Sequence, residues 1–267
     1  MNNYIMTMRA VDGSVVKLEC HDSLPSTLRL ARQYAKNSRD YPDRYVIFSE
    51  ERRTVTEKGK TIVERGIFMS LILRPSMFPS QAGLLSSLAA VAFATGLEEH
   101  TTRKIGIGWV SDIFCGEKLI GKASIEGKLD DFTAYEYLIV TFAATLSEED
   151  FPPRMTDLVR QVFEPENTSI SLIIAKHILN NFFSFYPNFR YHKKFMDIYQ
   201  RKFALRAEKI KYLDGDRRES CKVLGVDADN CSLIVENRKK AIMHIASPNK
   251  VITPKKLNKK NYLSQKS

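Results

Sequence analysis

The chain has 267 residues, of which 43% are hydrophobic and 27% are charged. These values are ordinary for a globular protein and exclude a disordered or fibrous chain. No signal peptide is expected, because Met1–Ala10 lacks an apolar core. The most apolar run, Ala82–Leu97, is short for a membrane span and predicts a buried helix. We therefore expect a cytoplasmic protein that makes no membrane contact.

The four cysteines form no C-x-x-C pair, so we predict free thiols and neither a zinc site nor a redox motif. The formal net charge is +10. The residues from 237 onward hold nine basic side chains and no acidic one, so the basicity belongs to the C-terminus. We expect residues 251–267 to form a flexible basic tail. Nucleic-acid binding is not expected, because this region has one aromatic residue, Tyr262, and no stacking pattern.

The N-terminal half alternates between short apolar runs and polar turns. Val16–Cys20 predicts an edge strand, and a helix is expected to begin at Ser26 or Thr27, either of which is a good N-cap. Strands are predicted at Tyr45–Ser49 and Gly66–Leu73, and a helix at Pro79–Leu97. Between the two strands lies the mixed-charge segment 50–65, for which a solvated loop is the simplest interpretation.

The stretch Ile105–Gly127 predicts a strand, a loop and a second strand. The alternating apolar residues end at Trp109. The next residues, Ser111 and Asp112, favour a turn, and Lys118 begins the following apolar run. A tryptophan, an aspartate and a lysine are thereby gathered at the ends of neighbouring strands. This arrangement can bind an anionic ligand.

The second half begins with a strongly apolar strand at Tyr135–Leu146. Amphipathic helices are predicted at Thr168–Phe185, with His177 as a packed core residue, and at Tyr191–Leu205. Short alternating runs after Ala207 predict a small antiparallel β-barrel. We predict two domains, residues 1–205 and 206–250, followed by the tail.

Several motifs of this chain resemble those of biotin protein ligases. Residues 107–112 are similar to the family's I-K-W-P-N-D and residues 118–121 to its K-[LI]-[AG]-G, while residues 66–75 match G-x-[LY]-x-S-x-x-L-R-P. The resemblance runs from about Leu18 to about Val251. It implies an α/β (α+β) fold with a mixed central sheet flanked by helices and a small C-terminal β-barrel. No DNA-reading helix-turn-helix is expected before it.

The resemblance also implies a set of site residues. Lys118 takes the place of the lysine that bridges the biotin carboxylate and the α-phosphate. The implied biotin-binding residues are Ser26, Thr27, Glu51 and Gly121, and the implied nucleotide-binding residues are Lys58, Gly59, Lys60, Trp109 and Asp112. No residue is expected to bind a resident metal ion.

The chain departs from the family pattern at several of these places. The family's glycine- and arginine-rich phosphate loop is replaced by residues 54–60, with Glu57 where the family has an arginine. The glycine-rich strand is replaced by residues 141–145, in which Phe142 either narrows the pocket or faces the other side of the sheet. Lys122 replaces an apolar family residue and is a candidate compensating cation. Other cations could come from shifted positions, at Arg52, Arg53, Lys58 and Lys60.

The implied reaction is the ATP-dependent attachment of biotin to a lysine of a biotin carboxyl carrier protein domain through biotinyl-5'-AMP. Biotin and ATP are the substrates, and Mg2+ arrives with the ATP. The alternative is a catalytically silent homologue that binds a carrier protein, biotin or a nucleotide. A lipoate ligase is disfavoured, because its glycine-rich loop is missing. The resemblance allows a homodimer.

Overall fold

The central element of the molecule is an eight-stranded mixed sheet. We describe residues 3–79, 82–151, 168–214, 217–252 and 254–258 of a computed structural model. The strands are β1 (Tyr4–Arg9), β2 (Val15–Leu24), β3 (Tyr45–Val55), β4 (Thr61–Leu73), β5 (Ile105–Ile107), β6 (Asp112–Cys115), β7 (Lys118–Leu129) and β8 (Tyr135–Thr145). Their order is β1-β2-β3-β4-β8-β7-β6-β5, and β2 and β3 form a parallel pair in this otherwise antiparallel order. The predicted mixed sheet is confirmed.

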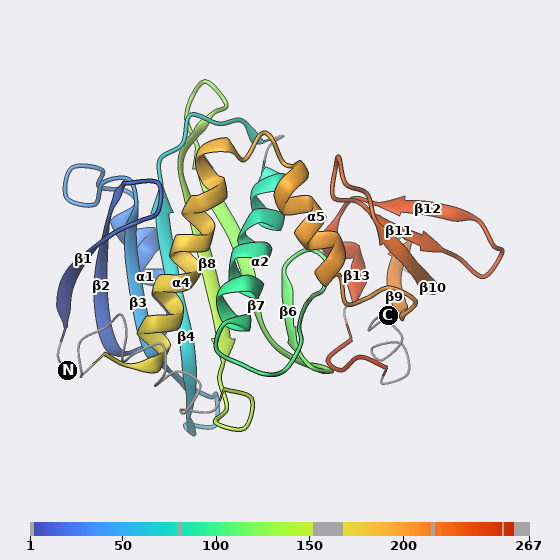
Figure 1. Cartoon of the computed structure of the whole chain (residues 1–267), viewed down its shortest axis with the longest axis horizontal. Coiled ribbons are helices and arrows are strands. Elements are labelled where there is room, and N and C mark those ends of the chain that lie inside the picture. Colours follow the sequence, from blue (N-terminus) through green and yellow to red (C-terminus); the bar gives the residue numbers. More distant parts are fainter. Residues whose placement is uncertain (1–2, 80–81, 152–167, 215–216, 253, 259–267) are drawn as a thin grey trace.

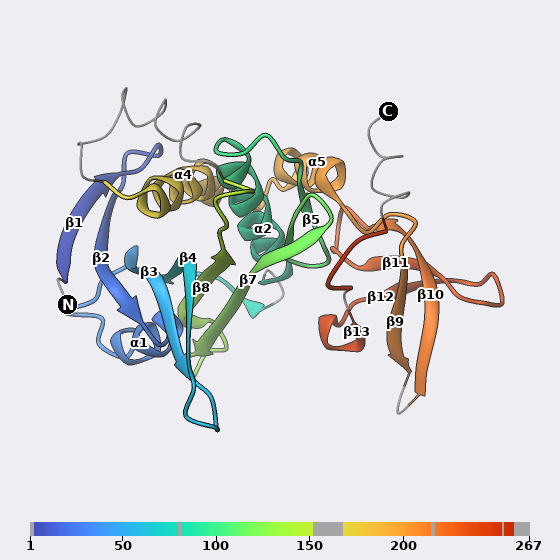
Figure 2. The same cartoon turned by 90° about the horizontal axis from the view of Figure 1, so that it is seen from below.

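Helices cover the two faces of this sheet unequally. Helices α2 (Ala82–Glu98), α4 (Ile170–Phe185) and α5 (Lys193–Lys202) lie over one face, and the short α1 (Thr27–Tyr34) lies on the other, as Figures 1 and 2 show. The face covered by α2, α4 and α5 holds the main core. On the other face, Ala31 of α1 and Ala35 at its end pack against a small cluster that includes Ile47, Ile72 and Ile139. Because α1 is only eight residues long, it leaves part of its face uncovered.

The apolar run expected as a buried helix is α2. Its one charged residue is the last, Glu98, and Leu85 and the residues from Leu88 to Ala94 have no exposed surface. The helix is apolar on all sides because it is packed between the sheet, α4 and α5. Among the described residues, none of the helices combines the length and apolar character needed to cross a membrane.

The alternation of β8 decides where Phe142 points. Its ring lies 5.5 Å from that of Phe93 in α2 and 6.2 Å from that of Phe182 in α4, so it belongs to the main core. Successive side chains of a strand face opposite sides. Thr141 and Ala143 therefore face the α1 side, and Phe142 does not narrow that face.

The C-terminal part forms a separate five-stranded antiparallel sheet, seen beside the main sheet in Figure 1. Its strands are β9 (Lys209–Asp214), β10 (Arg217–Val226), β11 (Leu233–Glu236), β12 (Ile242–Ile245) and β13 (Val251–Ile252). Short 3-10 helices lie at Tyr186–Asn188 and Pro248–Lys250. The predicted antiparallel unit is confirmed, and the boundary at residues 205–206, which stays a prediction, falls between α5 and β9.

Part of the segment expected as a flexible tail is built into the fold. Val251 and Ile252 pair with β9, and Leu257 is buried. The backbone of Lys255 accepts from the Leu119 amide (3.1 Å), and the Leu257 amide donates to Glu117 (2.8 Å). The expectation missed these contacts because they join residues far apart in the sequence. For residues 259–267 it falls outside the described part of the chain.

Candidate functional site

The uncovered part of the α1 face is formed by aligned rows of side chains. Strand register places one row at Asp112, Lys122, Ala143, Phe68 and Ser49, from β6 across to β3. The adjacent row on the same face consists of Ser124, Thr141 and Ser70. These positions are mostly small or hydroxylated. The middle of the sheet therefore offers a shallow polar floor.

Three hydroxyl groups form a continuous hydrogen-bonded series where α1 meets this floor. The Thr27 Oγ1 lies 2.9 Å from the Ser70 Oγ, which lies 3.0 Å from the Thr141 Oγ1. Thr27 and Ser70 are buried, and Ser26 is the N-cap of α1, its Oγ accepting from the Arg29 amide at 3.1 Å. Of the four predicted biotin-binding residues, two lie here: Thr27 faces the sheet and Ser26 caps the helix.

A cleft of about 350 Å3 continues from the first row. It is lined by Arg52, Glu64, Phe68, Asp112, Leu119, Ile120, Gly121, Lys122, Ala143, Ala144 and Thr145. The Arg52 guanidinium pairs with Glu64 at 2.6 Å and lies 4.9 Å from the centre of the Phe68 ring. The cleft therefore combines apolar walls with two basic and two acidic side chains, and one basic and one acidic side chain of these four pair with each other.

Asp112 and Lys122 face each other across β6 and β7 at the edge of this cleft. Asp112 is half-buried and Lys122 is exposed. Gly121 lies beside them, and a Cβ there would collide with the Ala143 carbonyl oxygen. Close approach at Gly121 is thus required by the neighbouring strand β8. Two of the predicted site residues, Asp112 and Gly121, are brought together.

Lys118 lies apart from this group. It is the first residue of β7, and its side chain lines a different hollow of about 670 Å3 together with Arg103, Glu149, Asp150 and Lys256. An irregularity in the β6–β7 register separates it from Gly121 and Lys122. The structure therefore does not place Lys118 in the cleft that holds Asp112.

The predicted phosphate-binding residues form the tip of a regular β-hairpin. The β3–β4 ladder continues to Val55 and Thr61, and the turn is closed by hydrogen bonds between Thr56 and Lys60. Gly59 has φ +75°, which an L side chain rarely adopts. Lys58 and Lys60 are exposed on this tip, which projects on the α1 side of the sheet in Figure 2, and neither lines the cleft.

Glu51, the residue proposed to replace a family glutamine, is held by two arginines. Its carboxylate pairs with Arg53 at 3.0 Å and Arg65 at 3.1 Å. Hydrogen bonds from these guanidinium groups lower the pKa of Glu51. It lies opposite Ser23 in the parallel β2–β3 pair, close to the loop that leads into α1. The carboxylate of Glu51 is thus charged and is held by arginines of its own strand and of β4.

Trp109 is a structural residue in this molecule. Its side chain is buried in the main core, and the indole Nε1 donates to the Cys231 carbonyl oxygen at 2.6 Å. Cys231 belongs to the C-terminal part of the chain, so the contact joins the two sheets. Trp109 does not line the cleft, and its predicted role beside a nucleotide stays a prediction.

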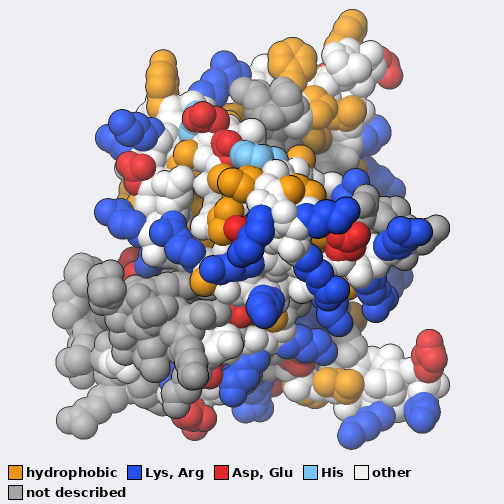
Figure 3. Space-filling model, turned by 90° about the vertical axis from the view of Figure 1, so that its right-hand side faces the viewer, with side chains coloured by type: hydrophobic (Ala, Val, Ile, Leu, Met, Phe, Trp, Pro, Cys, Tyr) orange, Lys and Arg blue, Asp and Glu red, His pale blue; other side chains and the backbone are white. Residues whose placement is uncertain are grey.

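A second polar surface lies on the C-terminal sheet. A hollow of about 690 Å3 there is lined by residues that include Arg217, Arg218, Arg238 and Lys239. Figure 3 shows that Lys and Arg side chains are numerous on this side of the molecule. Arg238 and Lys239 follow β11 closely, so part of the C-terminal basicity lies on a folded turn.

Sequence reasoning misses two members of the hydroxyl series. Ser70 and Thr141 sit in apolar runs, and nothing but the period of two distinguishes their face from the core. Ser70 coincides with the serine of the 66–75 motif, which is the available signal. Thr141 stands out in the sequence only as bulk in place of a glycine.

Comparison with known proteins finds a curated relative that is similar to part of the chain. No family model matches the chain. The Bifunctional ligase/repressor BirA of Bacillus subtilis is 26% identical over 178 residues, covering 64% of this chain and 54% of the relative. The chain thus matches about half the length of this curated relative.

Solved structures show which fold the chain shares. A point mutant of the biotin protein ligase from Aquifex aeolicus, in complex with biotin, aligns with a TM-score of 0.64 at 16% identity, covering 88% of this chain and 97% of that one. A biotin protein ligase-like protein of unknown function from Silicibacter aligns with a TM-score of 0.59 at 13% identity, covering 86% and 94%. The fold is that of the biotin protein ligases. In sequence, the chain is similar to BirA over 64% of its length.

Proposed function

We propose that this protein binds biotin and MgATP on the α1 face of its sheet and transfers biotin to a lysine of a carrier protein domain through biotinyl-5'-AMP. The observation that carries the proposal is the hydroxyl series Thr27–Ser70–Thr141 at the head of a cleft that contains Lys122 and Asp112. The solved relatives with this fold include a biotin protein ligase from Aquifex aeolicus in complex with biotin and ATP.

The hydroxyl series suits the polar ring of biotin. A ureido group offers one carbonyl acceptor and two N–H donors, and hydroxyls can both donate and accept. Thr27 and Thr141 stand on opposite sides of Ser70, so each can exchange its contact with Ser70 for one with the ring. The N-terminus of α1 adds a favourable partial positive charge. Glu51 accepts hydrogen bonds from Arg53 and Arg65, close to the loop that leads into α1.

The cleft suits the reacting carboxylate and phosphate. Both steps gather negative charge at one phosphorus and one carboxyl group, so catalysis requires positioned cations. Lys122 and Arg52 line the cleft, and Asp112 can orient the nucleotide or its Mg2+. The family resemblance assigns this step to Lys118, but because Lys118 lines a separate hollow, Lys122 takes its place in our proposal. Lys58, Gly59 and Lys60 would contribute from the hairpin tip.

A second candidate is a catalytically silent relative that binds biotin or a carrier protein. Two observations favour it. A regular hairpin occupies the place of the phosphate loop, and Lys118 lines a separate hollow. This candidate predicts ligand binding without adenylate formation. The expected homodimer and the lack of nucleic-acid binding stay predictions.

Calorimetric titration with biotin, with and without MgATP, tests the binding step, and ATP–pyrophosphate exchange tests adenylate formation. Thr141→Val removes one hydroxyl at constant shape and should lower biotin affinity about tenfold, because one hydrogen-bonded partner is lost. Thr7→Val is the matched control, since Thr7 is exposed on the edge strand β1. Biotin binding with exchange supports the ligase, and binding alone supports the silent relative. A folded protein that binds no biotin contradicts the ligase and the biotin-binding form of the silent relative.

A further inference from the structure

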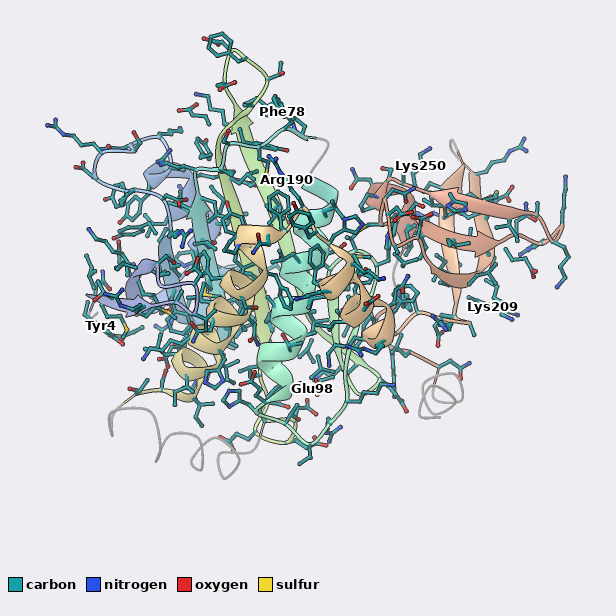
Figure 4. All side chains as sticks on the ribbon, turned by 45° about the horizontal axis from the view of Figure 1, so that its top comes forward. Tyr4, Phe78, Glu98, Arg190, Lys209 and Lys250 are labelled. Carbon is teal, nitrogen blue, oxygen red and sulfur yellow. The ribbon has the colours of Figure 1, made fainter. Side chains whose placement is uncertain are left out.

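Helices α2 and α4 come unusually close at the end of α2. A Cβ at Gly96 would lie 2.6 Å from the Ile178 Cγ1 and 2.9 Å from the Ile178 backbone nitrogen, so only glycine fits there. Glu98, labelled in Figure 4, ends α2, and Glu99 and His100 follow it at once. The close approach brings these two residues against His177 of α4.

Three ligand-type side chains converge at this point. The His100 Nε2 lies 3.2 Å from the His177 Nδ1, which lies 2.6 Å from the Glu99 Oε2. One ligand atom from each of the three residues lies within 4.8 Å of the others. His100 is completely buried, whereas the side chains of His177 and Glu99 are 25% and 48% exposed. The cluster is therefore anchored inside and open to solvent on one side.

Hydrogen bonding alone does not satisfy this arrangement. If the His177 Nδ1 carries a proton, it donates to Glu99, and the His100 Nε2 must then face the same N–H as a second acceptor. The proton of His100 would sit on its Nδ1, which is buried and has no partner among the described residues. If His177 Nδ1 is bare instead, its lone pair faces a carboxylate oxygen at 2.6 Å. Either assignment leaves lone pairs directed at one point.

We propose that Glu99, His100 and His177 are the ligands of a binding site for a divalent metal ion, and that this ion is Zn2+. Two imidazoles, one carboxylate and a water complete a four-coordinate zinc site. At Zn–N distances of about 2.05 Å, tetrahedral ligand atoms lie about 3.3 Å apart. The two ring nitrogens already meet this spacing at 3.2 Å. The Glu99 Oε2 lies 2.6 Å from the His177 Nδ1, so the exposed carboxylate must widen this one distance to about 3.3 Å.

The surroundings favour such a site. His100 is completely buried, which disfavours a charged ring, and an imidazole that binds zinc must be neutral. The Asn181 Nδ2 donates to the Glu99 Oε1 at 3.3 Å and leaves Oε2 directed at His177. The sequence predicts no metal site because the ligands lie far apart in it and meet only where the two helices approach. This inference is independent of the proposed ligase activity.

The role that follows is to fasten the end of α2 to α4. Both helices cover the main core, so an ion bound only in the folded state stabilises the whole domain. Tagless, chelator-treated protein should bind one equivalent of Zn2+ in competition with a chromogenic chelator. Co2+ should give the intense visible bands of a four-coordinate site. Saturating Zn2+ should raise the unfolding temperature.

Glu99→Gln and His177→Ala test the ligands without opening the core, since both side chains are partly exposed. Each should lower Zn2+ affinity about a hundredfold or more, because outer partners alone are worth ten- to a hundredfold. His192→Ala is the control and should leave binding unchanged. His192 lies just before α5, outside the cluster, and its Nε2 is 3.8 Å from Asp229 Oδ1. No stoichiometric Zn2+ or Co2+ binding by the folded wild type, or equal binding by both ligand variants, would overturn the proposal.

Discussion

At the scale of single residues, two lysines of strand β7 are the candidates for the cation that acts in adenylate formation. Lys122 lines the cleft with Asp112, whereas Lys118 lines the hollow behind the β6–β7 turn. We expect Lys122→Ala to reduce adenylate formation ten- to a hundredfold, about the effect of one charge-assisted hydrogen bond. Lys118→Ala, the matched control in the same strand, should change it less than about threefold. Pyrophosphate exchange measures both, and the reverse order would show that the family lysine still reaches the reacting groups.

The pH dependence of stability follows from His100. Burial holds the pKa of its imidazole at about 4 in the folded state, below the ordinary value of about 6.5. Between these values the unfolded chain binds more protons, so the free energy of unfolding falls as the pH is lowered through this window. The loss at its lower end is on the order of 3 kcal/mol.

Urea unfolding of chelator-treated protein at about pH 7.5, 6 and 5 measures this loss. At these three pH values Glu99 stays ionised, because its hydrogen bond with His177 holds the pKa of the Glu99 carboxyl below its usual value. His100→Gln should flatten the dependence, and His192→Gln should not. An unchanged slope in His100→Gln would assign the acid sensitivity to another group.

Which site residues can be predicted depends on what distinguishes them in the sequence. Thr27, Asp112 and Gly121 are predicted through motifs, and they do lie along the α1 face. Ser70 and Thr141 are not, because only strand register brings them together. The motif of Trp109 assigns it to a ligand, yet its hydrogen bond to Cys231 depends on a contact 122 positions away.

At the scale of elements, the β3–β4 hairpin is the largest departure from the predicted loop. Gly59 permits its turn by adopting φ +75°, and a Cβ there would meet nothing within 4 Å. Gly59→Ala should therefore cost about 1 kcal/mol through backbone strain alone. We expect faster hydrogen exchange at the Thr56, Gly59 and Lys60 amides.

The control for this change is Gly225→Ala, which also has open space around its Cβ but no positive φ. It should leave exchange in the hairpin unchanged. Equal protection in wild type and Gly59→Ala would mean that the turn can be rebuilt without strain. In that case the hairpin could rearrange over a nucleotide more easily than its regular ladder suggests.

Buried elements are easier to predict than exposed ones. The helices α2 and α4 and the strand β8 agree with their predicted ranges within a few residues, because long apolar runs leave few alternatives. The edge strands β1 and β13 are missed. β1 is largely exposed and β13 has two residues, so neither shows a clear apolar period. Their pairing depends on partners elsewhere in the chain.

At the scale of the whole molecule, Trp109 connects the two sheets. Trp109→Phe leaves the Cys231 carbonyl without its donor, and we expect a loss of about 1–3 kcal/mol in the free energy of unfolding. Tyr199→Phe, which removes the 2.8 Å hydrogen bond to the Val110 carbonyl oxygen, should act in the same direction. Tyr191→Phe is the control, since Tyr191 is 81% exposed. Urea unfolding followed by circular dichroism measures all three, and equal stability would show that the contact is dispensable.

The backbone holds the C-terminal sheet to the main sheet at two places. The chain enters it after α5, and it returns through Lys255 and Leu257, whose backbones bond to Leu119 and Glu117. The Trp109–Cys231 hydrogen bond is a third attachment, and residues of both sheets share one apolar core. Because attachments at three separate places hold a body against rotation, the C-terminal sheet keeps one orientation beside the main sheet. A force applied to its basic surface is therefore carried into the main core, and through Lys255 also into the β6–β7 turn that Lys118 follows.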